Sequence, residues 1–208
     1  MRGKFITIEG CEGAGKSRQI RELATYLEKK GVDVLVTREP GGNPISEQIR
    51  SVILAGKNTA MCDECEALLY AASRIQHLAE TVIPALKQGK TVLCDRFVHS
   101  SLAYQGHARG LGFDYVEQIN QKAMDECMPD CTLFLDISPR QAFLRKGGVD
   151  KNDRVELAGE AFHERVYEGY KMLLERYPMQ MVAIDPSGAV HQTTAKMIEE
   201  LQKRRLIP

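Results

Sequence analysis

The chain has 208 residues, of which 43% are hydrophobic and 27% charged, values typical of a folded soluble domain. Lys and Arg total 28, as do Asp and Glu, so no net charge attracts nucleic acid or an anionic membrane. The sequence contains no apolar run of about 18 residues and no signal-peptide pattern at its N-terminus. We therefore expect one domain over residues 1–208, a cytoplasmic location, and neither nucleic acid nor membrane as a partner.

Six cysteines raise the question of a metal site. Cys62 with Cys65, and Cys127 with Cys131, could together supply four thiolates to zinc. Neither pair lies in an obvious zinc knuckle, and helix-like sequence directly follows the first. The interpretation that the spacing favours is a set of reduced, structural thiols.

Strand-like and helix-like segments alternate from end to end, a pattern typical of a parallel sheet covered by helices on both faces. The pattern predicts strands at residues 4–9, 32–37, 91–94, 132–136 and 180–184. It predicts helices near residues 16–30, 44–55, 64–88, 114–126, 157–177 and 189–204. In such a sheet, ligands bind at the carboxyl ends of the strands.

The most informative stretch follows the first predicted strand and fits the phosphate-loop pattern G-x-x-x-x-G-K-S/T. Its residues are Gly10, Cys11, Glu12, Gly13, Ala14, Gly15, Lys16 and Ser17. Glycines let backbone N–H groups close around phosphate oxygens, and the following helix adds partial positive charge. Lys16 can reach the terminal phosphates, and Ser17 can offer its hydroxyl to Mg²⁺. The loop predicts binding of a nucleoside triphosphate.

Charged residues follow two further predicted strands. Asp95 ends the strand at 91–94, where a phosphate-loop protein is expected to hold Mg²⁺, and Arg96 beside it suits a phosphate. Arg38 and Glu39 begin a rigid turn rich in proline and glycine. These two residues either form an ordinary surface ion pair or project into the site. Arg50, on the next predicted helix, is likewise either a surface arginine or a further cation of the site.

The predicted helix at 64–88 has two distinct faces. An apolar stripe, expected to pack on the core, contains Leu68, Ala72, Ile75, Ala79, Val82 and Leu86. The opposite side carries Tyr70 and Arg74, which are neighbours because they are four residues apart. That side is either an exposed surface or a nucleobase pocket with a ring and a guanidinium.

Farther along the chain, after the strand at 91–94, Gln105 could match both a donor and an acceptor on a base edge.

Residues 145–155 turn polar, cationic and glycine-bearing. Composition alone indicates a mobile surface loop. In a phosphotransferase the same composition suits a lid that closes over the transferring phosphoryl group and excludes water.

Together these segments resemble a thymidylate kinase of the bacterial type. The matching residues are Glu9 with the phosphate loop, the turn at 38–42, Tyr70 and Arg74, the segment 95–105, and Asp153-Arg154. The resemblance implies a five-stranded parallel sheet of the nucleoside monophosphate kinase type and a homodimer. It implies transfer of the γ-phosphoryl of ATP to dTMP, giving dTDP and ADP, with Mg²⁺ as cofactor.

The resemblance also implies roles for single residues. Tyr70 would stack on thymine, Arg74 would bond the base carbonyl, and Ser101 and Gln105 would line the base. The remaining dTMP contacts would come from Glu9, Arg38, Glu39, Arg50, Arg96 and Tyr104. Glu9 would also lie near Mg²⁺, with Ser17 and Asp95. Arg18 and the segment 185–188 would flank adenine.

The catalytic cation is a separate question. Glu12 puts a carboxylate in the phosphate loop, and the resembling bacterial group supplies its catalytic arginine from the lid. Here Gly147 and Val149 stand where relatives can carry Arg, which leaves Arg145, Lys146, Lys151 and Arg154. The hypothesis is that Arg154 or Arg145 acts together with Lys16 and Arg96.

Two alternatives remain open at this point. A kinase for dUMP, dCMP or a deoxypurine monophosphate would share the phosphate chemistry, and one methyl group contributes only about 1–3 kcal/mol of discrimination. A nucleotide switch that binds ATP or GTP without turnover would share the phosphate loop.

Overall fold

The structure is a computed structural model that describes residues 2–146 and 153–208. Its strands are β1 (Phe5–Glu9), β2 (Val34–Arg38), β3 (Thr91–Asp95), β4 (Cys131–Leu135) and β5 (Met181–Ile184). Its α-helices are α1 (Lys16–Lys29), α2 (Pro44–Leu54), α3 (Asp63–His77), α4 (Ile83–Lys87), α5 (Val98–Ser101), α6 (Phe113–Cys127), α7 (Pro139–Lys146), α8 (Glu160–Arg176) and α9 (Val190–Lys203). The five predicted strands are confirmed to within two residues at each end.

The strands form one parallel sheet in the order β2-β3-β1-β4-β5. The central strand β1 pairs with both β3 and β4, so that Ile8 lies opposite Asp95 on one side and Leu133 on the other. This register brings the carboxyl ends of three strands to the same edge, where the phosphate loop begins. The predicted α/β fold with a five-stranded parallel sheet is confirmed.

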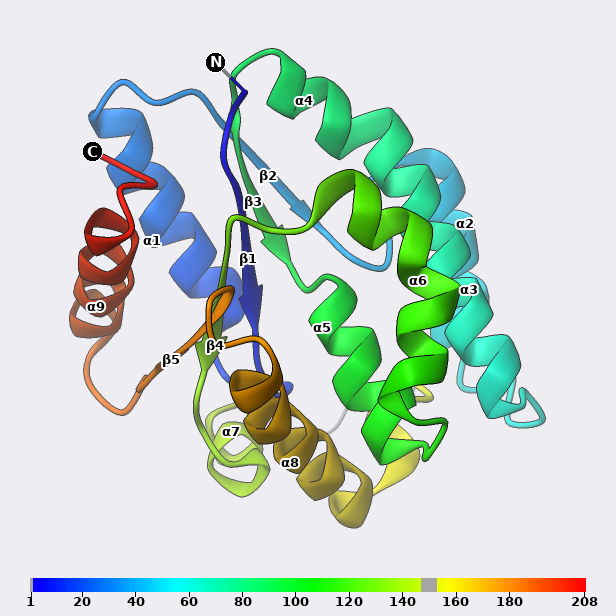
Figure 1. The fold of residues 1–208 in the computed structure, drawn as a ribbon. Helices are drawn as coiled ribbons and strands as arrows, with labels where there is room; N and C mark the ends of the chain where they lie inside the picture. The colour runs from blue at the N-terminus through cyan, green and yellow to red at the C-terminus, as the bar shows by residue number, and fades with distance from the viewer. Residues whose placement is uncertain (1, 147–152) are drawn as a thin grey trace.

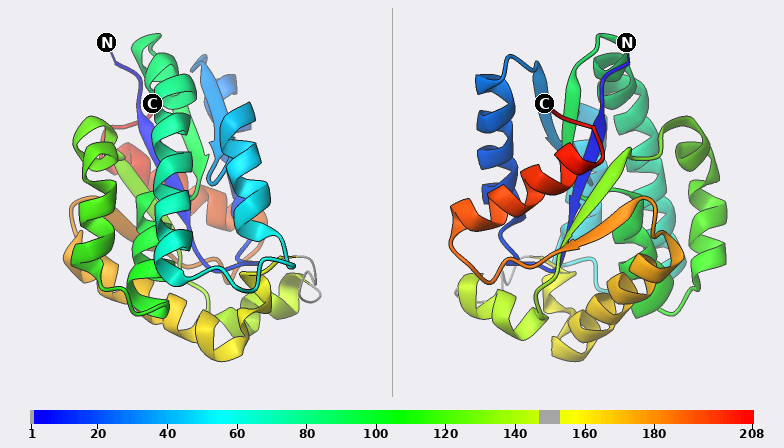
Figure 2. Two further views of the ribbon diagram at one scale, coloured as in Figure 1. Left: turned by 90° about the vertical axis from the view of Figure 1, so that its right-hand side faces the viewer. Right: turned by 60° about the vertical axis from the view of Figure 1, so that its left-hand side comes forward.

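Helices cover both faces of the sheet (Figure 1). On one face, α1 and α9 pack through Ile20, Leu23 and Leu201 against the inner strands. The other face carries α3 to α6 and α8, as the two further views in Figure 2 show. Both faces of β1 and β4 are therefore buried, which explains their continuous apolar sequence.

The predicted helix at 64–88 differs from the structure in continuity and in orientation. A π-helical segment, η1 (Leu78–Val82), separates α3 from α4. Pro84, two residues after this segment, has no N–H to continue the α-helical ladder. The predicted core stripe is wrong for α3, because Leu68 is 51% exposed whereas Arg74 on the other side is 1% exposed. The polar face of α3 points inward.

A further helical stretch was not predicted. After β3 the chain forms α5 and then a π-helical segment, η2 (Leu102–Ala108), which packs against α8. A short 3₁₀ turn, η3 (Glu156–Ala158), precedes α8. Within residues 2–146 and 153–208, no helix is long and apolar enough to cross a bilayer.

Candidate active site

The phosphate loop connects β1 to α1 through three glycines with positive φ: Gly10 at 143°, Gly13 at 81° and Gly15 at 96°. Side chains other than glycine rarely adopt these angles, so the loop depends on glycine here. Lys16 folds back over the loop, where its Nζ donates to the carbonyls of Gly10 at 3.2 Å and Cys11 at 3.1 Å. Burial lowers the pKa of Lys16, and the nearby Arg96 lowers it further.

Ser17 and Asp95 meet beside the loop. The Ser17 Oγ donates to Asp95 Oδ2 at 3.1 Å. The second carboxylate oxygen of Asp95, Oδ1, is buried and has no hydrogen-bond partner in the part of the chain that the structure describes. A hydroxyl next to an unsatisfied carboxylate oxygen is a donor set that suits Mg²⁺.

Two cavities adjoin at the carboxyl edge of the sheet. The loop cavity is lined by Glu12, Gly13, Gly15, Lys16, Ser17, Arg18, Arg21, Arg38, Glu39, Arg50, Asp95 and Arg96. The second, here called the inner cavity, is lined by Glu12, Glu39, Pro40, Arg50, Leu54, Tyr70, Arg96, Ser100, Ser101, Tyr104, Gln105, Asp153, Val155, Glu156 and His163. Four of these residues line both cavities: Glu12, Glu39, Arg50 and Arg96.

Arg96 lies at the junction of the two cavities. Its backbone has a φ of 73°, a left-handed conformation that is uncommon outside glycine. Its guanidinium donates to Ser100 Oγ and Tyr170 Oη, both at 3.1 Å, and pairs with Glu12 at 3.4 Å. It also lies over the Tyr104 ring, 5.0 Å from the centroid. These contacts fix a cation between the cavities.

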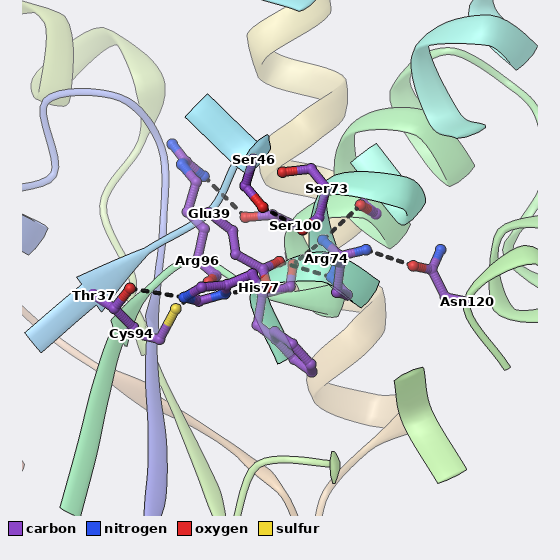
Figure 3. A network of polar contacts seen from close by, with 12 residues as sticks. Thr37, Glu39, Ser46, Ser73, Arg74, His77, Cys94, Arg96, Ser100 and Asn120 are labelled. Carbon is purple, nitrogen blue, oxygen red and sulfur yellow. Dashed lines mark hydrogen bonds and ion pairs between the residues drawn. The ribbon is translucent and has the colours of Figure 1, made fainter. Parts of the chain in front are cut away.

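A buried ion network forms the floor next to Arg96 (Figure 3). Arg74 Nε donates to Glu39 Oε2 at 2.7 Å, and His77 Nδ1 lies 2.9 Å from Glu39 Oε1. The other Arg74 nitrogens donate to Asn120 Oδ1, the Phe97 carbonyl and Ser101 Oγ. Arg74 itself lines neither cavity. It therefore holds Glu39 and Ser101 in place from behind.

A second buried carboxylate, Glu66, supports the far wall of the inner cavity. It accepts hydrogen bonds from Gln105, Arg109 and Arg154. The Arg154 backbone N–H also donates to the Leu54 carbonyl at 3.0 Å. The residues after position 152 are thus fastened to α2 and α3.

Glu9, at the end of β1, lies beneath both cavities and lines neither. Its Oε1 accepts from the Phe97 backbone N–H at 2.7 Å, and its Oε2 accepts from Ser100 and Tyr170. Burial raises the pKa of Glu9 in spite of these bonds and of Arg96 nearby. The carboxylate thus braces the elements around Arg96.

Comparison with known proteins agrees with this geometry. The thymidylate kinase family profile matches residues 8–197. A thymidylate kinase of Oceanobacillus iheyensis is 51% identical over 95% of this chain and 90% of its own length. One of Geobacillus is 47% identical over 98% of this chain and all of its own. The crystal structure of the Ehrlichia chaffeensis thymidylate kinase superposes with a TM-score of 0.78 at 30% identity, covering 97% of this chain and 99% of that one.

The chain belongs to the thymidylate kinase family. It is accordingly an ATP-dependent nucleoside monophosphate kinase that phosphorylates dTMP, the reaction expected from the sequence. The nucleotide switch is thereby set aside.

Most residues expected from the resemblance to thymidylate kinases lie at one of the two cavities. Tyr70, Tyr104, Ser101 and Gln105 line the inner cavity, and burial raises the pKa of the Tyr70 phenol. Arg18 and Arg38 line the loop cavity. Arg38 also pairs with Glu47 at 2.9 Å, while Arg50 donates to the Pro40 carbonyl at 2.9 Å.

The lid residues differ from the expectation in their placement. Arg154 contacts Glu66 and the Ile53 carbonyl, and Arg145 donates to the Pro186 carbonyl at 3.1 Å. Among the described residues, neither is part of the lining of the loop cavity or of the inner cavity. Gly147, Val149 and Lys151, with most of the predicted lid at 145–155, lie outside the described residues, as does the side chain of Lys146.

Several residues at or around this site were not predicted from the sequence. Glu66 and Tyr170 are buried and bind the cavity residues Gln105 and Arg96, and His163 lines the inner cavity. Asn120 is buried and binds Arg74 behind the cavities. Glu66 and Asn120 are separated from their partners by tens of residues, with no motif around them. A carboxylate in the first turn of a helix ordinarily reads as dipole stabilisation, so Glu66 gave no separate signal.

Proposed function

We propose that the phosphates of ATP occupy the loop cavity, that dTMP occupies the inner cavity, and that the phosphoryl group is transferred where the two meet. The observation that carries this proposal is the position of Arg96, a cationic residue that lines both cavities. Transfer between two anions needs one cation in contact with both, because their repulsion is the main obstacle to approach.

On the ATP side, the loop N–H groups and Lys16 would hold the phosphates. The two carbonyls that Lys16 now contacts keep its ammonium folded over the loop. A phosphate oxygen is a stronger partner for the ammonium than a carbonyl, so Nζ would exchange them when ATP binds. Arg18 and the segment 185–188 would flank adenine, with Arg145 supporting that segment through Pro186.

Mg²⁺ would be held by Ser17 and Asp95. The fit rests on Asp95 Oδ1, which is buried without a partner among the described residues, and on the adjacent Ser17 hydroxyl. Mg²⁺ prefers oxygen ligands and usually keeps several waters besides one or two carboxylates. When bound, it neutralises charge on the phosphates. Glu9 would act indirectly, because its oxygens bind Phe97, Ser100 and Tyr170.

On the acceptor side, the Tyr70 ring would stack on the base, and Ser101 and Gln105 would contact its polar edge. Tyr104 would close the cavity beside Arg96. Arg50 and Arg38 would contact the acceptor phosphate, and Glu39 would lie by the sugar. Arg74 would act through Ser101 and Glu39, which it holds by hydrogen bonds of 3.1 Å and 2.7 Å.

The chemical step would need no general base. A phosphate monoester has a second pKa near 6, so its attacking oxygen is mostly anionic at neutral pH. Arg96 and Lys16 would then stabilise the charge that spreads over the transferring group. In this arrangement Arg96 is the principal catalytic arginine, with Arg145 and Arg154 placing the segments on either side of residues 147–152.

The test is ADP release with ATP and Mg²⁺ against dTMP, dUMP, dCMP, dAMP, dGMP and AMP. The proposal predicts acceptor-dependent turnover with a strong preference for dTMP. Preference for another monophosphate would keep the phosphate chemistry but remove thymine from the inner cavity. ADP release that is independent of any acceptor would contradict the assignment of the two cavities.

We also propose a homodimer formed through α2 and α3 and a cytoplasmic location. The predicted core stripe of α3 instead leaves Leu68 exposed, and α2 beside it exposes Ile45 and Val52, each by about half. Exposed apolar side chains on two adjacent helices suit a contact with a second copy. Sedimentation equilibrium should give a dimer that Leu68→Glu converts to a monomer.

The cysteines support the cytoplasmic location. All six have free thiols, which fits a reducing compartment.

A further inference from the structure

Glu66 is a completely buried carboxylate with three neighbours that donate to it. Its Oε1 accepts from Gln105 Nε2 at 2.8 Å, and its Oε2 accepts from Arg109 Nη2 at 3.0 Å. Arg154 donates to the same Oε2. Glu66 itself lines neither cavity, so any influence on a ligand must pass through one of these partners.

The surroundings keep Glu66 ionised. Burial by itself would raise its pKa, but the Arg109 guanidinium and the hydrogen bonds from Gln105 and Arg109 outweigh burial and lower the pKa. An ionised carboxylate can only accept hydrogen bonds. The group that Gln105 turns toward Glu66 must therefore be its NH₂.

This fixes which end of the Gln105 amide faces the inner cavity. Gln105 lines that cavity, and its Oε1 has no hydrogen-bond partner among the described residues. The reversed amide would place a carbonyl oxygen against the carboxylate and lose the bond, which leaves buried polar groups unpaired. The cavity is therefore offered an acceptor at this point.

The neighbouring hydroxyl offers the opposite polarity. Ser101 Oγ accepts from Arg74 Nη2 at 3.1 Å, so its own hydrogen can donate into the inner cavity, which Ser101 also lines. Thymine and uracil present a ring N3–H donor next to a C4 carbonyl acceptor. Cytosine presents an unprotonated N3 acceptor next to an amino donor, and mismatches both groups.

We propose that Glu66 is a positioning residue that selects the base: by fixing the Gln105 amide with its carbonyl toward the cavity, it favours pyrimidines with an N3–H and rejects cytosine. The inference rests on the proposed binding of dTMP in the inner cavity. Glu66 does not contact the substrate itself. Its replacement should therefore change the ratio of dTMP to dCMP turnover.

The test compares kcat/KM for dTMP and dCMP in wild type and Glu66→Gln. A glutamine at 66 can accept or donate, so the Gln105 amide can reverse and present its NH₂ to cytosine. The dTMP-to-dCMP ratio should fall about tenfold or more. Arg176→Gln on α8 is the control, because its arginine pairs with Glu117 at the surface, contacts neither Glu66 nor Gln105, and should leave the ratio unchanged.

The double variant Glu66→Gln with Gln105→Glu exchanges the amide and the carboxylate and again presents only an acceptor to the base. It should restore the ratio to within about threefold of wild type. Because it keeps the local charge, it also provides a test if Glu66→Gln alone fails to fold. A wild-type ratio in folded Glu66→Gln, or a lost ratio in the double variant, would overturn the proposal. Absence of dTMP turnover in the wild type would instead contradict the placement of dTMP.

Discussion

The two cavities of this kinase are built in different ways. Half of the residues that line the loop cavity come from one short run, Glu12 to Arg18, and the others are Arg21, Arg38, Glu39, Arg50, Asp95 and Arg96. The inner cavity takes side chains from α2, α3, α5 and η2, and from the segment before α8. One local run thus supplies much of the loop cavity, whereas the inner cavity is assembled from side chains of segments that are far apart in the sequence.

The difference has an energetic consequence. Backbone N–H groups in a glycine-rich turn need no charged partner to stay in place. The inner cavity depends on two buried carboxylates, Glu39 and Glu66, each matched by arginines. Removing one member of such a pair leaves an uncompensated charge, so this wall should be more sensitive to substitution in stability than the loop is.

Arg96 belongs to both cavities, and its loss should have the largest effect. Arg96→Met should lower kcat by about 10³–10⁵, because an arginine at a transferring phosphoryl group contributes on that scale. Pre-steady-state measurement of dTDP formation would isolate the chemical step. Arg176→Gln on α8, whose arginine is exposed and pairs with Glu117, is the control and should keep wild-type kcat. A loss below tenfold for Arg96→Met would show that the main catalytic cation lies elsewhere.

The buried ion pair between Arg74 and Glu39 can be compared with an exposed arginine–glutamate pair at the surface. Arg74→Met should cost about 3–5 kcal/mol in unfolding free energy, because it strands the buried Glu39. Arg38→Gln should cost about 0–1 kcal/mol, because Arg38 and Glu47 are both more than 40% exposed. Urea unfolding of both variants gives the two values. Equal losses would contradict the structural importance of the buried network.

The dependence of activity on Mg²⁺ tests the metal site proposed at the loop cavity. Asp95→Asn should raise the Mg²⁺ concentration needed for half-maximal activity at least about 10–100-fold, the range found when groups around metal sites are altered. Titration of activity with Mg²⁺ at saturating ATP and dTMP measures it, and chelation with EDTA should abolish wild-type turnover. An unchanged Mg²⁺ requirement would remove Asp95 from the metal site.

Tyr70 tests the inner cavity by itself, through binding of dTMP alone. Tyr70→Leu removes the ring and should raise KM for dTMP by about 5–150-fold, corresponding to about 1–3 kcal/mol of stacking. Tyr70→Phe keeps the ring and should change KM little. KM for ATP should stay constant in both variants, and a rise there would mean that the two cavities are not separate.

The sequence was sufficient to predict the parts that depend on local patterns. The five strands follow from apolar runs, and the phosphate loop follows from glycines and a lysine at fixed spacing. Asp95 and Arg96 were expected at the edge of the sheet because they follow a buried strand. In each case a short stretch carries the whole signal.

The parts that could not be predicted depend on contacts between distant residues. The apolar stripe of α3 suggested that Leu68 faces the core, but Glu39 and Asn120 compensate the burial of Arg74 and draw the polar face inward. Glu66 carries no local signal, since its partners lie 39, 43 and 88 residues away. Hydrophobic periodicity cannot detect a helix whose charged side is the buried one.

The central claim is that two separate cavities meet at Arg96, and a molecule that spans both tests it most directly. We would measure by calorimetry the binding of adenosine and thymidine joined through five phosphates, in parallel with ATP and dTMP alone. If the cavities adjoin, the linked molecule should bind about 10²–10⁴-fold more tightly than either nucleotide. Affinity no better than that of the tighter single nucleotide would contradict the account.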